Sequence, residues 1–214
     1  DEAIASEVHS VGFVDKHWAG YGLSLVGARI ENIQSDGSYV DELKAYLPDK
    51  KVSIRKLPQV EFLVRRRQYA LGRLTFWVSM ESSAGLLRRS EPRFQTGQFT
   101  ERFDLQPRLM TALRWKGFTL LPSFAVRETY YGSRMEQGQF AGANVSRFGR
   151  EFTLELVPPS LAKVSDGPRW LGDKVKHVIE PRAVFRHAAG YDDFNKLIRF
   201  DDIELAANTT ELEI

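Results

Sequence analysis

The chain has 214 residues, of which 43% are hydrophobic and 27% are charged, and its formal net charge is only +2. This hydrophobic fraction excludes a disordered chain, and the weak charge without a dense Lys/Arg patch argues against nucleic-acid binding. The sequence has no cysteine, which excludes disulfide scaffolds and thiol catalysis, and no apolar run near the roughly 20 residues that a membrane helix needs.

The first part of the chain lacks an export signal and contains three predicted strands. Residues 1–5 carry neither the basic nor the apolar region of an export signal, so we expect a processed chain or a fragment. Strands are predicted at 8–16 and 20–31. A further strand is predicted at 52–64, where Val60, Phe62 and Val64 share one side.

The segment 73–87 follows a period of two, with most of its apolar residues at even positions. Its even positions include Leu74, Phe76 and Val78, whereas its odd positions include Arg73 and Glu81. Such a period of two predicts a strand far longer than the roughly five or six residues of a typical soluble strand.

The segment 99–115 repeats the pattern with the opposite parity. A helix would scatter its charged residues around the circumference, whereas a strand places them all on one side. The strand therefore has two faces. Its odd positions are mostly apolar (Phe99, Phe103, Leu105, Pro107, Leu109, Leu113, Trp115), and its even positions include Arg102, Asp104, Arg108 and Arg114.

Lys116 and Gly117 fit a two-residue hairpin turn between this strand and the next. The turn fixes a register in which four pairs all fall on the apolar side, and a slip by one residue would destroy this agreement. The predicted pairs are Trp115 with Phe118, Leu113 with Leu120, Leu109 with Phe124, and Phe103 with Tyr130.

Further strands are predicted at 146–158, 174–187 and 206–214. Short links at 16–19, 65–72 and 116–117 alternate with longer connections at 32–51, 89–98, 132–145 and 189–205. The long link at 159–172 breaks this alternation. Short turns at one end and long loops at the other are typical of outer-membrane barrels.

Three prolines lie inside the predicted strands. Pro107, Pro122 and Pro181 each remove one hydrogen bond from the sheet, and all three fall on the apolar side. We expect β-bulges at these positions, because a bulge is one of the places where a strand can contain proline.

Aromatic residues are grouped near both ends of the predicted hairpin. Trp115 and Phe118 flank the tight turn, while Phe103, Tyr130 and Tyr131 lie about a dozen residues away. Two aromatic bands separated by aliphatic residues are typical of a strand that crosses both interfaces of a membrane.

Catalytic and metal-binding patterns are weak. His9 and Ser10 are adjacent, so a strand points them to opposite faces, and no G-x-S-x-G motif occurs. The acidic pairs at 192–193 and 201–202 fit a solvated loop better than a divalent-cation site. We therefore predict no enzymatic activity, no cofactor and no metal.

The polar side of the strands carries more basic than acidic residues. The arginine side chain forms a fork that suits phosphate and carboxylate groups, so this side would favour an anionic solute. The candidate ligand-binding residues are Arg73, Glu81, Arg102, Asp104, Arg108, Arg114, Arg127, Lys176, Glu180, Arg182 and Arg186.

Four phrases, in order along the chain, resemble a known family. They are LPQVEF at 57–62, FDLQPRL at 103–109, the segment from Pro122 to Tyr131 with RETYY at its end, and KHVIEPR at 176–182, followed by DDFN at 192–195. These phrases resemble motifs of the lipopolysaccharide-assembly outer-membrane protein family (LptD, also called OstA or Imp), and the resemblance covers residues 6 to 202.

The resemblance implies a large barrel that inserts lipopolysaccharide into the outer leaflet of the bacterial outer membrane. In that family a periplasmic jellyroll receives the lipid from a bridge protein, an LptE-like lipoprotein plugs the lumen, and a seam opens laterally. The implied partners are lipopolysaccharide, the plug lipoprotein, the bridge protein and outer-membrane lipids. Because the jellyroll and the family cysteines are absent, we expect residues 1–214 to form a single barrel segment without the barrel-closing strands.

These observations together predict an all-β fold: the wall of an antiparallel transmembrane β-barrel with roughly eight or nine strands. Three alternatives stay open. They are a porin-like channel for small anionic solutes, a soluble β-sandwich that acts as a binding module, and a barrel hydrolase with serine and histidine side chains within hydrogen-bond reach.

Overall fold

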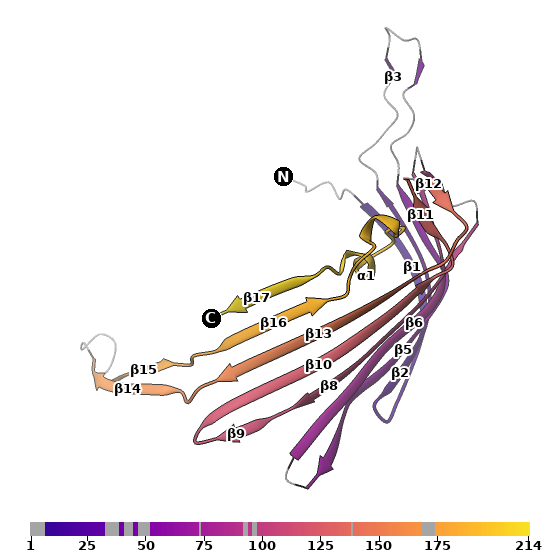
Figure 1. Cartoon of the computed structure of the whole chain (residues 1–214). Coiled ribbons are helices and arrows are strands. Elements are labelled where there is room, and N and C mark those ends of the chain that lie inside the picture. The colour runs from indigo at the N-terminus through magenta and orange to yellow at the C-terminus, as the bar shows by residue number, and fades with distance from the viewer. Residues whose placement is uncertain are drawn as a thin grey trace.

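The computed structural model describes residues 7–32, 39–40, 45–46, 52–72, 74–91, 94–95, 98–137, 139–167 and 174–214. These residues form one large antiparallel sheet that curves as a single layer (Figure 1). Its strands lie in the order β1 (Glu7–Trp18), β2 (Tyr21–Asn32), β5 (Ser53–Leu71), β6 (Leu74–Glu91), β8 (Thr100–Thr111), β10 (Phe118–Tyr131), β13 (Val145–Val157), β16 (Ala183–Ala189) and β17 (Thr209–Glu213). This order confirms the predicted all-β, antiparallel architecture.

Short elements extend the sheet at its two ends. Strand β7 (Phe94–Gln95) pairs with β6, and β9 (Leu113–Trp115) pairs with β10. Among the described residues, three separate ribbons are β3–β4 (Tyr39–Val40, Ala45–Tyr46), β11–β12 (Arg134–Glu136, Gln139–Ala141) and β14–β15 (Leu161–Asp166, Lys174–Ile179). The helical elements in this part of the chain are η1 (Phe194–Lys196) and α1 (Asp202–Leu205).

Connections of different length lie at opposite ends of the sheet, as predicted, although the short link predicted at 65–72 is strand as far as Leu71. The tight turns after β1, β5 and β9 are at one end, whereas β3, β11, β12 and α1 gather at the other (Figure 1). The predicted long link at 159–172 is partly strand, because β14 and β15 form an arm that projects beyond the sheet. No helix in the described residues is long and apolar enough to cross a bilayer.

The predicted hairpin is present with the predicted register. Trp115 pairs with Phe118, Leu113 with Leu120, Leu109 with Phe124, and Phe103 with Tyr130. Lys116 and Gly117 form the turn with φ values of 46° and 85°. Positive φ at both central residues is the geometry of a type I′ hairpin, which matches the twist of the flanking strands.

The prediction of bulges at the three prolines is wrong. Pro107 pairs with Met80 and Pro122 with Leu154, and no register shift occurs at either residue. The hydrogen-bonded ladder between β8 and β10 is interrupted beside both prolines and resumes in the same register. Pro181 instead divides the strand predicted at 174–187 into β15 and β16, because it lies in the connection between them.

The bulges lie in β5, where register shifts occur between Lys56 and Gln59 and between Val64 and Arg67. A bulge adds one residue to one strand, so the side chains beyond it change face. Lys56 therefore lies on the same face as Gln59, and Arg55 lies on the opposite face from the one that simple alternation predicts.

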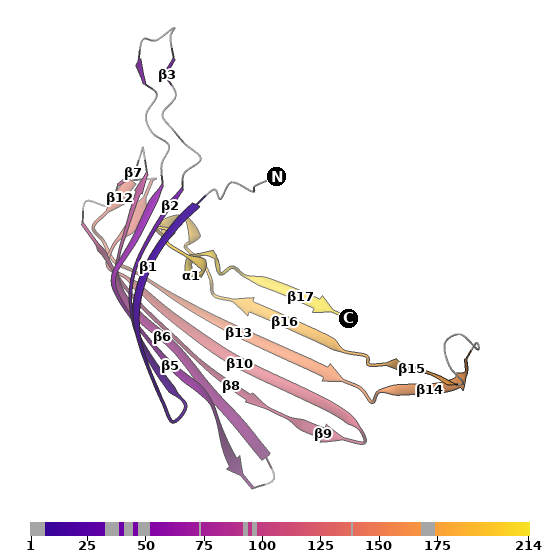
Figure 2. The same cartoon turned by 180° about the vertical axis from the view of Figure 1, so that it is seen from behind.

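The two faces of the sheet have different surroundings. The segment 190–208, which contains η1 and α1, lies on the concave side (Figure 2), where Leu87, Ile198 and Phe200 form a small buried cluster. On the convex side Leu109 is 45% exposed and Phe124 is 48% exposed. The described residues therefore place no second layer over the convex face.

One aromatic residue lies on the face opposite to the expected one. Trp115 and Phe118 contact each other near the tight turn, with ring centroids 6.4 Å apart, and Phe103 is exposed on the convex face. Tyr131, which was expected to join the second aromatic band, is instead 1% exposed on the concave face. Its neighbour Tyr130 has the parity of Phe103, so Tyr131 must point the other way.

Candidate functional site

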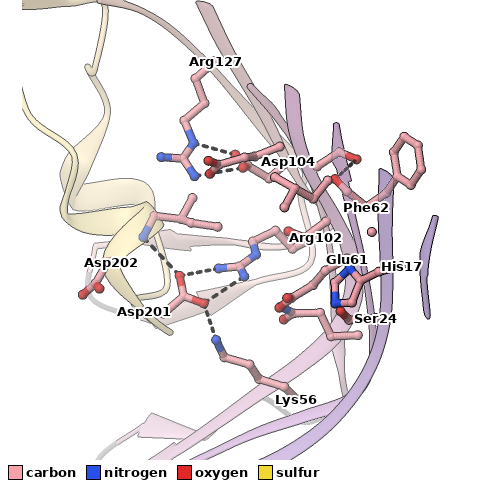
Figure 3. Close-up of a pocket in the computed structure, with 17 residues that line it drawn as sticks. His17, Ser24, Lys56, Glu61, Phe62, Arg102, Asp104, Arg127, Asp201 and Asp202 are labelled. Atoms are coloured by element: carbon pink, nitrogen blue, oxygen red, sulfur yellow. Dashed lines mark hydrogen bonds and ion pairs between the residues drawn. The ribbon is translucent and has the colours of Figure 1, made fainter. Parts of the chain in front are cut away.

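A cavity of about 480 Å³ lies on the concave face between the sheet and the segment 201–203. Strands β1, β2, β5, β6, β8 and β10 all contribute to its lining, because their inward side chains converge where the sheet curves (Figure 3). The lining is mainly polar and charged. Its members include His17, Ser24, Lys56, Gln59, Glu61, Glu81, Arg102, Asp104, Arg127 and Asp201.

Arg102 connects the sheet to the inward segment. Its guanidinium group donates hydrogen bonds to both carboxylate oxygens of Asp201, at 2.8 and 2.9 Å, and to Glu204 Oε1 at 2.8 Å. Lys56 donates to Asp201 Oδ2 at 2.5 Å, and Figure 3 shows both cations directed at this carboxylate. The pair of Arg102 and Glu204 is almost completely buried, with side chains 1% and 0% exposed.

Glu204 is held from three directions. Its carboxylate accepts hydrogen bonds from the Tyr131 hydroxyl at 2.9 Å and from the backbone N–H groups of Phe200 and Asp201 at 2.9 and 2.8 Å. The Asp201 side chain accepts from the backbone N–H of Ile203 at 3.1 Å, which completes a capping box at the start of α1. Both oxygens of the buried Glu204 carboxylate therefore accept hydrogen bonds, as a buried charge requires.

The pKa of Asp201 follows from the same contacts. Burial alone would raise the pKa of this carboxyl group, but the hydrogen bonds and positive charge of Arg102, and then those of Lys56, outweigh the burial and hold the pKa well below its usual range. Asp201 is therefore ionised throughout the physiological pH range.

Arg147 fixes the far end of α1. It donates to the carbonyl oxygens of Ile203, Glu204 and Ala206, which lie in the last turn of the helix and just after it. A cation at this position satisfies carbonyl groups that have no partner within the helix and complements the helix dipole. The segment 201–206 is therefore bound by charged side chains at both ends.

A second network orders the floor of the cavity. Asp104, which is 3% exposed, accepts two hydrogen bonds from the Arg127 guanidinium group, both at 2.9 Å, and one from the Thr129 hydroxyl at 2.6 Å. A bidentate contact of this kind holds the arginine in one orientation. The Arg127 charge is thus placed at the cavity but largely neutralised by Asp104.

A third network surrounds Glu151 on β13. Glu151 accepts hydrogen bonds from Arg108 at 3.1 Å and from the Tyr191 hydroxyl at 2.6 Å. Burial, followed by the contact with Glu151, raises the pKa of Tyr191, so this loop tyrosine remains a hydrogen-bond donor at neutral pH. The ring of Tyr191 lies where a Cβ atom at position 149 would be, so Gly149 is required for this packing.

The structure brings part of the predicted set of ligand residues together. Glu81, Arg102, Asp104 and Arg127 line the cavity. Arg108 lies on the same face but beyond the cavity, beside Glu151.

Arg114 lies on the same face near the tight turn. It is exposed and pairs in register with Thr119.

Other predicted residues lie apart from this group. Lys176 is on the β14–β15 arm, and Glu180 and Arg182 are in the connection that Pro181 creates between β15 and β16. Arg182 pairs with Glu155 at 2.8 Å, and Arg186 on β16 pairs with Glu213 at 2.9 Å. Arg73 lies outside the described residues.

Several residues of the site were missed from the sequence. Lys56 and Tyr131 were assigned to no ligand set, and Arg147 was not considered. One signal was available: Asp201 is followed three residues later by Glu204, which is the spacing of a capping box. This spacing predicts a helix start within the loop, although it does not predict what the two carboxylates bind.

The three hydrogen-bond networks hold charged side chains in fixed positions and do not expose reactive groups. Within the described ranges, no group of three His, Cys, Asp or Glu side chains is placed to hold a metal ion. The carboxylates accept hydrogen bonds from arginine, lysine, tyrosine and backbone donors, so the networks hold these polar side chains in fixed positions.

Comparison with known proteins identifies a protein family. The sequence model of the family described as "LptD: LPS transport system D" matches residues 30–213. This range contains the whole cavity wall from β5 to β10 and the segment 190–208. No curated protein and no solved structure matches the chain.

Proposed function

The chain belongs to the LptD family of lipopolysaccharide transport proteins, and from this membership we propose that it forms part of the wall of the outer-membrane barrel that delivers lipopolysaccharide to the outer leaflet. The family acts in lipopolysaccharide transport and assembly, is associated with the outer membrane and is not an enzyme family. The finer proposal is that residues 1–214 act as one barrel-wall segment.

The separation of the two faces carries this proposal. Along β8 and β10 the apolar side chains Leu109 and Phe124 are exposed on the convex face, while Asp104, Arg108 and Arg127 form ion pairs on the concave face. A barrel wall needs this separation, because one face meets lipid and the other meets water. The same separation argues against the soluble sandwich, in which the apolar faces of two sheets cover each other.

The concave face would accommodate the polar part of the lipid. Arg108 is 39% exposed and Arg114 is exposed, so both can reach a solute in the interior even though Arg108 also contacts Glu151. Guanidinium groups bind phosphate and carboxylate well. In this mechanism the sugars and phosphates pass along the wet interior and the acyl chains leave through a lateral seam.

The proposed partners follow from the family. An LptE-like lipoprotein would occupy the lumen and a periplasmic bridge protein would supply the lipid. The proposed location is the bacterial outer membrane, with the long connections outside the cell and the tight turns in the periplasm.

Charge reversal at Arg108 and Arg114 in the full-length protein tests this role. Glu at both positions should slow the appearance of lipopolysaccharide at the cell surface, because an anionic wall repels the phosphates. Lys163→Glu on the exposed β14 strand is the matched control and should transport normally. Arg102 is unsuitable for this test, since its replacement would break the anchor of the inward segment.

Normal delivery in the double variant, with normal amounts of folded protein in the outer membrane, would contradict the electrostatic role of the interior. If the wild-type chain failed to fractionate with the outer membrane, the barrel-wall proposal itself would fail.

A further inference from the structure

Three arginines lie side by side across three neighbouring strands. Arg29 on β2 is the register partner of Arg55 on β5, and Arg55 is the register partner of Arg88 on β6. Directly opposed residues have Cβ atoms about 5 Å apart, so their side chains share one patch of surface. We call these three residues the arginine row.

The arginine row lies on the convex face. Its neighbours along the chain point to the concave side, where Lys56 reaches Asp201 and Leu87 is buried against Ile198. Successive side chains of a strand point to opposite faces, so Arg55 and Arg88 point outward. The bulge between Lys56 and Gln59 produces this placement, because without it Arg55 would face the interior.

The charge of the row is only partly compensated. Arg29 is hydrogen-bonded to Glu31, which also accepts from Ser53. Among the residues that the structure describes, no ion pair or hydrogen bond is made by the side chains of Arg55 or Arg88. Like charges directly opposite each other destabilise a sheet, so an anion placed between them would relieve the repulsion.

The position of the row along the strand is also informative. On β2 the outward side chains run from Tyr21 near the tight turn through Leu23 and Leu25 to Arg29. Eight residues of strand span about 26 Å along the strand, which at a barrel strand tilt of about 35–45° is a rise of about 18–21 Å within an apolar band about 25 Å tall. The row therefore lies in the upper part of this band, towards the long connections, where long arginine side chains can reach the headgroup region.

We propose that the arginine row is a binding site, on the outside of the wall, for the phosphorylated headgroup of lipopolysaccharide in the surrounding leaflet. Each guanidinium group of Arg55 and Arg88 offers a planar pair of donors that matches phosphate oxygens. The inference rests on the proposed function for the placement in the membrane, but it concerns the face opposite to the transport route. The site holds lipid beside the wall rather than lipid in transit.

The test uses the full-length protein in phosphatidylcholine nanodiscs that contain bisphosphorylated lipid A, with retained lipid A measured by native mass spectrometry. The double variant Arg55→Gln/Arg88→Gln should reduce the retention of lipid A about tenfold or more, because each charge-assisted hydrogen bond to phosphate contributes substantially to the binding affinity. Lipid A without phosphates should be retained as weakly by the wild type as phosphorylated lipid A is by the double variant.

Two further variants separate binding from folding. Arg150→Gln removes an arginine whose register partners on the same outer face are Val126 and Ala189, and it should leave retention unchanged. Glu31→Gln removes the carboxylate that engages Arg29 and should increase retention, which a folding defect could not do.

Wild-type retention in the double variant would overturn the inference, as would equal retention of phosphorylated and unphosphorylated lipid A. Either result would leave the proposed transport role intact if the protein still inserts into the nanodisc and delivers lipopolysaccharide. Failure of the wild type to insert would remove both proposals. Competition by inorganic phosphate alone, without any requirement for the lipid, would identify a free-phosphate site and overturn the lipid assignment.

Discussion

Arg102 and Glu204 are 102 positions apart in the sequence, yet their side chains meet at 2.8 Å and are 1% and 0% exposed. The contact joins the centre of the sheet to the short helix α1. Removing one partner of a buried ion pair is strongly destabilising, because the other partner is left as an uncompensated buried charge. This contact therefore ties the inward segment to the sheet.

Arg102→Met should destabilise the fold by roughly 3–5 kcal/mol, because it leaves Glu204 as a buried charge without its cation. Chemical denaturation of the full-length protein in detergent measures the loss. Arg186→Met provides the comparison, since its pair with Glu213 is 45% and 64% exposed and should contribute at most about 1 kcal/mol. Equal losses in the two variants would show that the buried pair has no special role.

Tyr131→Phe should loosen the segment around Glu204 without unfolding the sheet. It removes one hydrogen bond to a charged acceptor, which contributes about 1.5–3 kcal/mol, and keeps the buried ring. Hydrogen exchange at the backbone N–H of Phe200 should accelerate, because that group donates to the same carboxylate. Tyr130→Phe on the opposite face should leave this exchange unchanged, and a similar acceleration there would argue against the assignment.

Gly117→Ala should destabilise the β9–β10 hairpin by about 1 kcal/mol or more. Gly117 has a φ of 85°, which is unfavourable for a residue with a Cβ atom, and a Cβ atom would lie 3.2 Å from Pro159. Gly12→Ala on β1 is the control, because nothing lies within 4 Å of the added atom. The midpoint of thermal unfolding should fall for the first variant and stay constant for the second.

The anchor at Asp201 should resist mild acid. The pKa of Asp201 in the folded protein lies below its ordinary value of 3.8, so the ionised form stabilises the fold above that pH, and the stabilisation is lost as the pH falls further. Hydrogen exchange at Ile203, corrected for the intrinsic effect of pH, should therefore stay slow down to about pH 4. Asp201→Asn should exchange faster throughout, and loss of protection near pH 6 in the wild type would contradict the assignment.

The alternation of apolar and polar residues and the turn residues predicted the parts of the fold that depend on strands adjacent in the sequence. The register between Trp115 and Phe118 follows from a two-residue turn and from apolar pairing alone, and both signals lie within one short stretch of sequence. The prediction of bulges was wrong because Pro107 and Pro122 interrupt the hydrogen-bonded ladder without shifting the register of the strands. The bulge in β5 reversed the face of Arg55, which alternation by itself could not show.

The candidate site was less predictable, because its contacts join residues far apart in the sequence. Asp201 meets Lys56 and Arg102 only after the sheet has brought β5 and β8 side by side. Arg102, Arg108 and Arg114 lie on one face, as alternation predicts, but nothing local distinguishes Arg102, which is buried against carboxylates, from Arg114, which is exposed.

The segment between β16 and β17 contacts five neighbouring strands, through Lys56, Arg89, Arg102, Tyr131 and Arg147. Each of these strands must already be adjacent to the next before the segment can bind them all. The segment can therefore complete these contacts only when the five strands are adjacent, and its protection from exchange would report that the strands have joined in the correct order.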